Sequence, residues 1–386
     1  MKVLFLTRDL AIGGSQRQLA VLASGLAGRG HDVAVVTLYG GGPLEGLVGD
    51  SGARLVSIEK RNRWDVIAPL ARLRWLFVAE RPDVVYAFLP TQTTLAALLL
   101  PRRLATKLVF GLRAGGMQLN HYDRLSALTY RSEAWLSRRA DLSIANAQAV
   151  RADAATRGFQ VDRIVVVPNG IDTDAIRPDA AAGRAERRRW GVPANAFVIG
   201  CVARLDPMKD HANLINAAAA FARTNPDARF VCVGDGSSDT RKMLITLANS
   251  LEIADRVLWV GTTDDMKAVY SAFDIATLTS AFGEGFPNVI GEAMACGIPV
   301  VATDVGDAGQ IIGEFGEVVP PRNPDCLCAA WSRLRRRLEQ NPALHEATRS
   351  SIIARYGLHA MLCRTEDILT PLVAGRPAEE IVYQFS

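Results

Sequence analysis

Two carboxylates separated by a turn with Gly and Pro are the most informative feature of this chain, in the segment Glu284-Gly-Phe-Pro-Asn-Val-Ile-Gly-Glu292. Residues 274–280 predict a buried strand before this segment, and the small, apolar residues 289–296 predict a helix. In an open α/β sheet, loops at the carboxyl ends of strands line the ligand crevice. N–H groups at a helix start hold anionic oxygens there, and a carboxylate one turn further accepts hydrogen bonds from ribose or sugar hydroxyls. The segment therefore suits a sugar nucleotide better than a surface loop with two solvated Glu residues.

A basic pair follows another predicted strand, residues 198–202. Arg204 and Lys209 lie within one loop, Arg-Leu-Asp-Pro-Met-Lys-Asp. A forked guanidinium and a point-like ammonium together suit a pyrophosphate. A solvated basic loop is the alternative, but the position directly after the first strand of the second half favours binding.

Glycines mark three further loops. Gly13 and Gly14 follow the first predicted strand and open a helix, where they expose backbone amides to a ligand. No complete Gly-x-Gly-x-x-Gly is present, and no acidic residue lies at the right distance, so a nicotinamide cofactor is not supported. Gly234 and Thr263 lie in turns after the next strands of the second half, where backbone groups and Asp265 could read a base. Both turns, like Gly13-Gly14, are also consistent with plain structural turns.

Alternating strands and helices must position these loops. The pattern predicts an α/β fold with parallel sheets covered on both faces. A chain of 386 residues exceeds one ordinary core, so we expect two doubly wound, Rossmann-like domains facing across a cleft: residues 1–170, joined by a C-terminal helix at about 358–386, and residues 171–357. The predicted strands are 3–7, 32–38, 84–88, 107–110, 142–145 and 164–167 in the first half, and 198–202, 229–233, 257–260, 274–278 and 299–302 in the second.

Composition excludes several classes of function. The chain is 49% hydrophobic and 22% charged with a net charge of +4, which is too small to indicate nucleic acid. The apolar run at the amino terminus is too short for a signal-peptide core, and the apolar region 84–100 is interrupted by 90–94, so no spanning helix is expected. Six cysteines lack metal-ligand spacing. We therefore expect a cytoplasmic protein with reduced thiols.

The first half is rich in basic residues and tryptophans. If they share one face, they would bind anionic headgroups or lie in a membrane interface. A solvated basic face is the alternative. These observations allow peripheral association with the inner face of the cytoplasmic membrane. The residues are Arg61, Arg63, Arg72, Arg74, Arg102, Arg103, Lys107, Trp64 and Trp75.

Across nearly its whole length, the chain resembles the retaining glycosyltransferases of family 4, which have the GT-B fold. The resemblance is most specific in the second half. The matching elements are Gly13-Gly14, Arg204 with Lys209, Val233-Gly-Asp-Gly236, the two glutamates at 284 and 292, Gly297-Ile-Pro-Val-Val-Ala-Thr-Asp304, and the interdomain segment Pro168-Asn-Gly-Ile-Asp172.

The resemblance implies a role for each of these residues. It implies that Arg204 and Lys209 hold the donor diphosphate, that Glu292 binds the ribose and that Glu284 faces the donor sugar. It implies no metal or other cofactor, because fixed positive groups offset the charge of the leaving diphosphate. Further donor contacts are implied for the turn residues Gly285, Phe286, Pro287, Asn288 and Val289.

The chain departs from the family on the acceptor side. Where many relatives have a His near the acceptor, this chain has Arg113, so either Arg113 does a related job or the acceptor is anionic. His121 is a weaker substitute, since a lone His in a polar loop is more often solvated. Glutamates common in relatives are replaced by Gln16 or Gln18 and by Gln310, which leaves donor-sugar contacts open.

The resemblance and the residues together predict a metal-independent retaining hexosyltransferase. Its donor would be a UDP or GDP sugar and its acceptor a glycan or lipid-linked glycan, in envelope or exopolysaccharide synthesis. Two alternatives stay open. One is a GT-B-type sugar-nucleotide epimerase, and the other is a non-catalytic subunit that binds a sugar nucleotide without turning it over.

Overall fold

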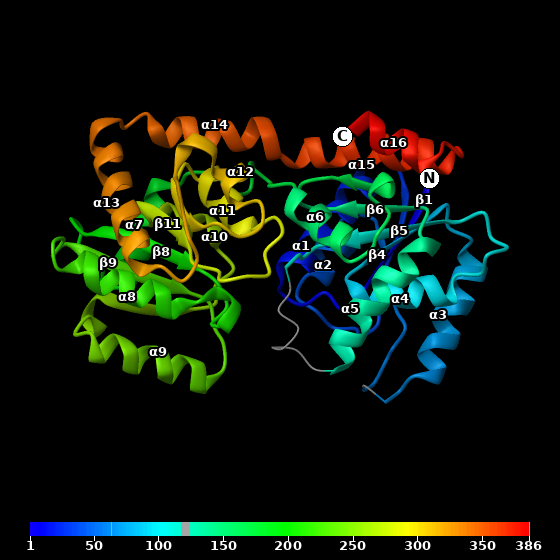
Figure 1. Cartoon of the computed structure of the whole chain (residues 1–386), viewed down its shortest axis with the longest axis horizontal. Helices are drawn as coiled ribbons and strands as arrows, with labels where there is room; N and C mark the ends of the chain where they lie inside the picture. Colours follow the sequence, from blue (N-terminus) through cyan, green and yellow to red (C-terminus); the bar gives the residue numbers. More distant parts are fainter. Residues whose placement is uncertain (63, 117–123, 386) are drawn as a thin grey trace. The chain divides into compact units, whose positions relative to one another are not determined.

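The computed structural model describes residues 1–62, 64–116 and 124–385, which divide into two compact units (Figure 1). Unit 1 comprises Met1–Gly170 and His359–Ser386, and unit 2 comprises Ile171–Leu358. Each unit contains one sheet in which every strand pairs in parallel with its neighbours. Because all strands of a parallel sheet point the same way, the loops at their carboxyl ends collect at one edge of each sheet.

In the described part of unit 1, seven strands lie in the order β3-β2-β1-β4-β5-β6-β7. The central strands are buried on both faces, which explains their continuous apolar runs. Phe5, Tyr86 and Phe88 pack together beneath the sheet's carboxyl edge. The strands are β1 Lys2–Thr7, β2 Asp32–Thr37, β3 Arg54–Ser57, β4 Val84–Phe88, β5 Lys107–Leu112, β6 Leu142–Ala145 and β7 Ile164–Val166.

Helices cover both faces of this sheet, and the helix α15 near the C-terminus belongs to the same unit. On α1, Gly25 faces the Leu362 side chain of α15 with no room for a Cβ atom. Arg29 and His31 both pair with Glu366 of α15. The helices are α1 Gly14–Gly28, α2 Glu45–Gly49, α3 Ile67–Glu80, α4 Pro90–Leu99, α5 Arg124–Leu136, α6 Gln148–Thr156, α15 Leu358–Val373 and α16 Ala378–Phe385.

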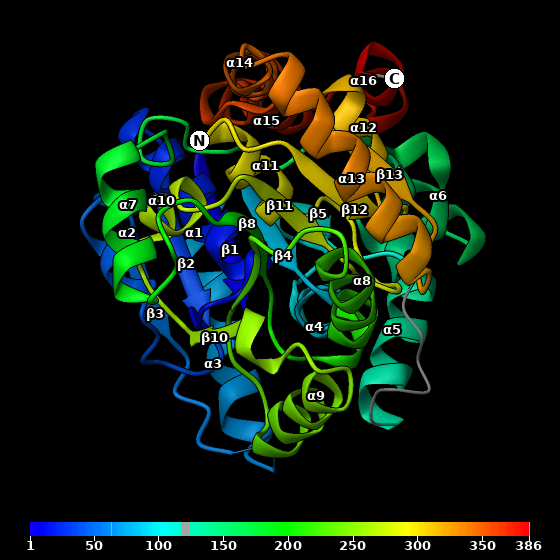
Figure 2. The ribbon, with the colours of Figure 1, turned by 90° about the vertical axis from the view of Figure 1, so that its left-hand side faces the viewer.

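Unit 2, all of whose residues the structure describes, has six strands in the order β10-β9-β8-β11-β12-β13. The core on one face is built around Phe221, Phe230 and Trp331, whose rings pack against one another. Figure 2 shows α13 beside α8, which it contacts along that face. The strands are β8 Phe197–Val202, β9 Ala228–Val233, β10 Val257–Gly261, β11 Ile275–Leu278, β12 Val300–Thr303 and β13 Glu317–Val319. The helices are α7 Ala180–Arg189, α8 His211–Ala222, α9 Ser238–Ser250, α10 Met266–Ser271, α11 Asn288–Ala295, α12 Ala308–Ile312, α13 Pro324–Gln340 and α14 Leu344–Tyr356.

The sequence missed two strands, β3 and β13. Both lie at the edges of their sheets and are short. Three of the four residues of β3 are exposed, and only Val319 of β13 is buried. An edge strand that is half covered lacks the continuous apolar run by which the central strands were recognised.

Candidate functional site

The loop after β8 is held by its own side chains. Asp206 accepts a hydrogen bond from the Met208 amide at 2.9 Å, and Asp210, with a φ of 47°, caps α8 by accepting from the Asn213 amide at 3.2 Å. Arg204 points into solvent, with 69% of its side chain exposed and Asp206 at 3.7 Å. The guanidinium therefore stays available to an external anion.

Lys209, at the end of the same loop, pairs with Glu284. Its Nζ lies 2.5 Å from Glu284 Oε1, and the two side chains are only 15% and 9% exposed. The hydroxyl of Ser280 donates to the same carboxylate oxygen at 2.6 Å. Thr279 donates its hydroxyl to the Lys209 carbonyl at 2.7 Å, which ties the loop after β8 to the end of β11. The structure thus brings together two predicted site residues that lie 75 positions apart.

The turn from Glu284 into α11 has the predicted local structure. β11 ends at Leu278 and α11 begins at Asn288, so Glu284 lies in the strand-to-helix loop. Pro287 occupies the N-cap position, and the ring of Phe286 is buried against Tyr356 at a centroid distance of 5.2 Å. Phe286 can therefore meet a ligand through its backbone rather than its ring. The other turn residues proposed for donor contacts, Gly285 and Val289, flank it on this loop and on the first turn of α11.

Glu292 lies one turn into α11, as predicted. Its carboxylate accepts a hydrogen bond from the Tyr270 hydroxyl at 2.8 Å. Tyr270 comes from α10 and is fully buried, so its hydroxyl fixes the position of the Glu292 carboxylate.

A close backbone approach supports the Glu284 loop. Gly306, with a φ of 64°, follows β12 and lies so near this loop that a Cβ atom would come within 2.4 Å of the Gly285 carbonyl oxygen. The Asp307 amide donates to the same carbonyl at 2.9 Å. The position requires glycine both for its backbone angle and for space.

Gly234 has a similar structural reason. Its φ is 135°, a Cβ atom there would lie 2.1 Å from the Ala203 carbonyl oxygen, and its amide donates to the Gly261 carbonyl at 2.7 Å. Gly234 thus lets the loop after β9 pack on the loop after β8. Thr263 is half-buried after β10. Asp265 caps α10 by accepting from the Ala268 amide at 3.0 Å, so one of its oxygens is already engaged.

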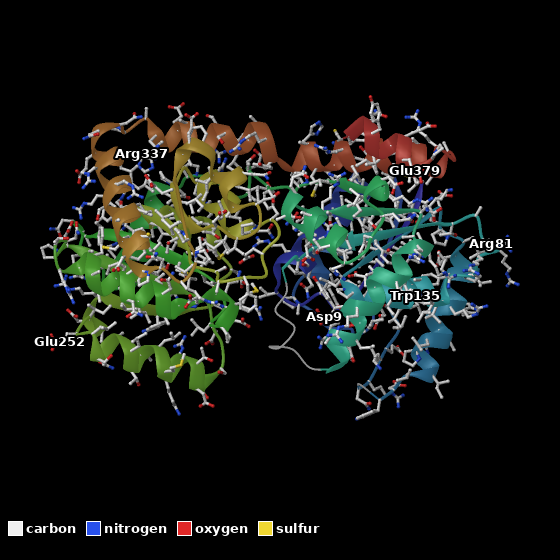
Figure 3. All side chains as sticks on the ribbon, viewed as in Figure 1. Asp9, Arg81, Trp135, Glu252, Arg337 and Glu379 are labelled. Carbon is white, nitrogen blue, oxygen red and sulfur yellow. The ribbon has the colours of Figure 1, made fainter. Side chains whose placement is uncertain are left out.

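In unit 1, Gly13 and Gly14 lie where β1 passes into α1. The helix begins at Gly14, slightly earlier than expected, and Gly13 is its extended N-cap. Gln16 donates to Asp9 Oδ1 at 3.3 Å (Asp9 is labelled in Figure 3). Gln18 is buried and exchanges two hydrogen bonds with the Gly170 backbone, at 3.0 and 3.2 Å. The Gln18 side-chain amide therefore bonds to the backbone of its own unit.

Arg113 lies at the carboxyl end of β5 and is buried. It donates to the Tyr86 hydroxyl at 2.8 Å and to Asn169 Oδ1 at 3.4 Å, and its guanidinium lies 4.0 Å from the centre of the Phe88 ring. Its Nε–H has no partner in the described structure. Burial lowers the pKa of Arg113. The partners of Arg113 are neutral. Among the described residues, no carboxylate pairs with this cation at the carboxyl edge of the sheet.

Three site neighbours escaped the sequence. Ser280 and Tyr270 hold the two glutamates, and His211, on α8, is buried beside Lys209. Burial, and then the Lys209 charge, lower the pKa of His211 to about 4. Only the serine, four residues before Glu284, carried a local signal. His121 lies outside the described residues. Within the described ranges, no group of three or more His, Cys, Asp or Glu is placed to hold a metal ion, and no helix there is long and apolar enough to cross a membrane.

Comparison with known proteins follows the two units. The family model described as "Glycosyltransferase Family 4" matches residues 12–175, and the one described as "Glycosyl transferases group 1" matches residues 196–337. A D-inositol 3-phosphate glycosyltransferase of Salinispora arenicola (strain CNS-205) is 35% identical over 216 residues, 52% of this chain and 47% of the relative. A GDP-mannose-dependent alpha-(1-6)-phosphatidylinositol monomannoside mannosyltransferase of Mycobacterium tuberculosis (strain ATCC 25618 / H37Rv) is 30% identical over 213 residues, 53% of this chain and 54% of the relative. The chain thus spans about half the length of the curated relatives it matches.

Two solved structures are similar over almost the whole chain. Anabaena Alr3699/HepE in complex with UDP-glucose has a TM-score of 0.84 at 24% identity, covering 97% of this chain and 100% of that one. WaaG, described as a glycosyltransferase involved in lipopolysaccharide biosynthesis, has a TM-score of 0.74 at 19% identity, covering 95% and 99%. These likenesses confirm the predicted α/β fold.

Proposed function

Because the chain belongs to glycosyltransferase family 4 and has the GT-B fold, we propose that it transfers a hexosyl group from a nucleotide-diphospho sugar to a hydroxyl acceptor. The observation that carries the proposal is the buried pair of Lys209 and Glu284 beside the amino terminus of α11. This arrangement presents a cation, backbone N–H groups and a carboxylate to one ligand, which suits a diphosphate joined to a sugar.

Each group has a distinct part in the proposed reaction. Lys209 gives one N–H to Glu284 and keeps others for a phosphate oxygen. Arg204, exposed on the same loop, adds a second positive charge for the leaving diphosphate. These two fixed charges take the role that a metal ion has in other sugar transferases. Glu284 orients the transferred sugar, and Glu292, held by Tyr270, accepts from the ribose hydroxyls.

The proposed transfer retains the configuration at the sugar carbon. The acceptor hydroxyl attacks on the face from which the diphosphate leaves, and the departing phosphate oxygen takes the hydroxyl proton. The bond between sugar carbon and phosphate oxygen breaks as the new glycosidic bond forms, so no enzyme base is required. Because Lys209 and Arg204 carry positive charge, they stabilise the diphosphate as its negative charge grows.

We propose a UDP or GDP sugar as donor, in line with the names of the relatives, one of which depends on GDP-mannose while a structural neighbour contains UDP-glucose. The acceptor we propose is a glycan or lipid-linked glycan in envelope or exopolysaccharide synthesis. Arg113 marks the acceptor side in unit 1, since it leaves a buried positive charge at the carboxyl edge of that sheet.

A thermal-shift screen of UDP, GDP and ADP sugars identifies the donor, because a bound ligand stabilises the folded chain by mass action. Transfer and slow hydrolysis of that donor are then compared between wild type, Lys209→Ala and the exposed control Lys242→Ala. We expect Lys209→Ala to lose turnover and Lys242→Ala to keep it. Tight binding of a nucleoside diphosphate by the wild type, with no release from any sugar nucleotide, would instead identify a non-catalytic binding subunit.

We also propose that unit 1 associates with a membrane surface through α3 to α5. Three tryptophans on or next to these helices are exposed: Trp64 by 83%, Trp75 by 68% and Trp135 by 70%. Basic residues accompany them, among them Arg74 on α3 and Arg103 after α4. Aromatic side chains beside cations suit an interface with anionic lipid. Trp75→Ser and Trp135→Ser should each reduce the amount of protein that cosediments with vesicles. Unchanged vesicle binding in both variants would refute the proposed membrane association.

A further inference from the structure

A pocket of about 370 Å³ lies in unit 1 at the edge where β5 and β6 begin. Its wall is formed by the loop between α4 and β5 and by the short turn after α5. Gly13 and Arg113 follow the carboxyl ends of strands in the same sheet, so the pocket lies at the opposite edge from these predicted site residues. It is therefore distinct from the site of the proposed function.

The lining of this pocket is strongly positive. Four cationic side chains and one carboxylate line it, and they are Arg102, Lys107, Arg138, Arg139 and Asp141. The carboxylate is already engaged, because Asp141 accepts from the Leu108 amide at 2.8 Å and lies 3.7 Å from Lys107 Nζ. Across the described ranges, none of the three arginines has a carboxylate partner within ion-pair distance.

One of these arginines, Arg139, is disfavoured as a cation by its surroundings. Arg139 is half-buried and donates to the Leu100 carbonyl at 3.5 Å. Burial, followed by the charge of Arg102, lowers the pKa of Arg139. Like charges held together at the wall of a pocket attract an anion, because one bound anion relieves their repulsion and restores the lost solvation.

We propose that this pocket binds a phosphate group, carried either by a phospholipid headgroup or by a freely diffusing phosphate ester. Arginine forks suit the oxygens of a phosphate. Exposed apolar side chains next to the pocket fit a lipid as the source of the phosphate. Leu98 lies two residues before the pocket wall and is 54% exposed. Trp135, labelled in Figure 3, is on α5 and lies three residues before Arg138. Both side chains come from helices that pack against each other, α4 and α5.

The competing explanation is that the arginines stabilise the end of α5. Arg138 and Arg139 follow the last turn of that helix, where the helix dipole favours cations. In that case their removal lowers stability and leaves anion binding unchanged. The two explanations therefore differ in what Arg102 does, because Arg102 lies on the other wall and is remote in sequence from α5.

The test compares Arg102→Gln and Arg139→Gln with Arg223→Gln, which removes the same charge from an exposed position of unit 2 that does not line the pocket. One arm titrates inorganic phosphate by calorimetry. It uses chains that also carry Lys209→Ala and Arg204→Gln, which remove both cations proposed to bind phosphate at the donor site. The other arm measures cosedimentation with vesicles of phosphatidylcholine alone and with added phosphatidylglycerol. Thermal unfolding of each variant controls for stability.

We expect each pocket substitution to weaken binding of its probe about fivefold, from the contribution of one basic residue near an anionic surface, while Arg223→Gln changes it little. Weakened binding of inorganic phosphate supports a free phosphate ester, and weakened binding of phosphatidylglycerol vesicles alone supports a lipid headgroup. Equal effects of Arg102→Gln and Arg223→Gln, a loss of stability without a change in binding, or no binding of either probe would each overturn the proposal.

Discussion

Replacing Lys209 by methionine perturbs the pair at the centre of the candidate site. The ammonium lies 2.5 Å from Glu284, and both side chains are mostly buried. Without the ammonium, the carboxylate keeps the Ser280 hydroxyl at 2.6 Å but loses its only ion pair among the described residues. A buried charge left without its partner costs about 3 kcal/mol. We therefore expect Lys209→Met to lower the free energy of unfolding of unit 2 by about that amount.

A double variant separates charge from packing. Lys209→Met with Glu284→Gln removes both charges, and the new amide still accepts from Ser280. Replacing a buried ion pair by neutral groups is often nearly neutral, so we expect the double variant to lose only about 1 kcal/mol. The double variant should then be about 2 kcal/mol more stable than Lys209→Met alone. The control Lys267→Met breaks a partly exposed pair with Asp179 at 2.9 Å and should cost much less than Lys209→Met.

Hydrogen exchange at amides of β8 and α8 in increasing urea reports on unit 2 alone, which matters because two units need not unfold as one. Turnover of the identified donor should fall on the order of 10²–10³-fold in both the single and the double variant, as for loss of one transition-state charge contact. Equal destabilisation by the single and double variants would refute the buried-pair reasoning. Recovery of turnover in the double variant would show that Lys209 only neutralises Glu284.

Three further predictions test neighbouring features. Arg204→Gln should leave thermal stability unchanged, because the side chain is 69% exposed, yet it should weaken donor binding about tenfold. Arg223, also exposed, is the control: Arg223→Gln should change neither stability nor donor binding, and a matching loss of donor binding there would contradict a specific role. Gly306→Ala should destabilise unit 2 by about 2 kcal/mol and lower kcat, because Gly306 has a φ of 64° and the new Cβ atom would meet the Gly285 carbonyl. Gly309→Ala is the control, since the nearest atom to a Cβ there is 3.9 Å away. Equal melting temperatures for the two variants would contradict the predicted clash. Burial lowers the pKa of His211 from 6.5 to about 4, so the unfolded chain takes up this proton at a higher pH than the folded chain. The contribution of neutral His211 to the free energy of unfolding is therefore complete above pH 6.5 and falls by about 3 kcal/mol as the pH drops to 4. His211→Leu should flatten the pH dependence of stability over that range, and an unchanged slope would disprove the lowered pKa.

Local patterns were sufficient where one element decides the structure. Most predicted strands agree with the structure to within two residues at either end, because central parallel strands carry continuous β-branched runs. The turn from Glu284 to Glu292 was also predicted, since small apolar residues after a proline begin a helix. The edge strands β3 and β13 were missed because half-exposed strands lack that pattern.

Contacts between distant segments were beyond the sequence. The sequence left open whether Gly234 contacts the donor or serves as a plain turn, and only the structure shows that it packs closely against the Ala203 carbonyl. Gln18 lies where relatives have a glutamate, and only the structure shows that its side chain hydrogen-bonds to the Gly170 backbone. Arg113 was recognised as unusual, yet its burial against Phe88 follows only from how β4 and β5 pair.

The sequence by itself determined the residue types of the candidate site and the local loops that hold them, because strand, turn and helix signals act over a few neighbouring residues. The tertiary structure decided which of them meet. Lys209 and Glu284 pair because β8 and β11 are adjacent in the sheet although they are far apart in the chain. Strand order depends on packing across the whole unit, so the buried charge pair that carries the proposed chemistry became visible only in three dimensions.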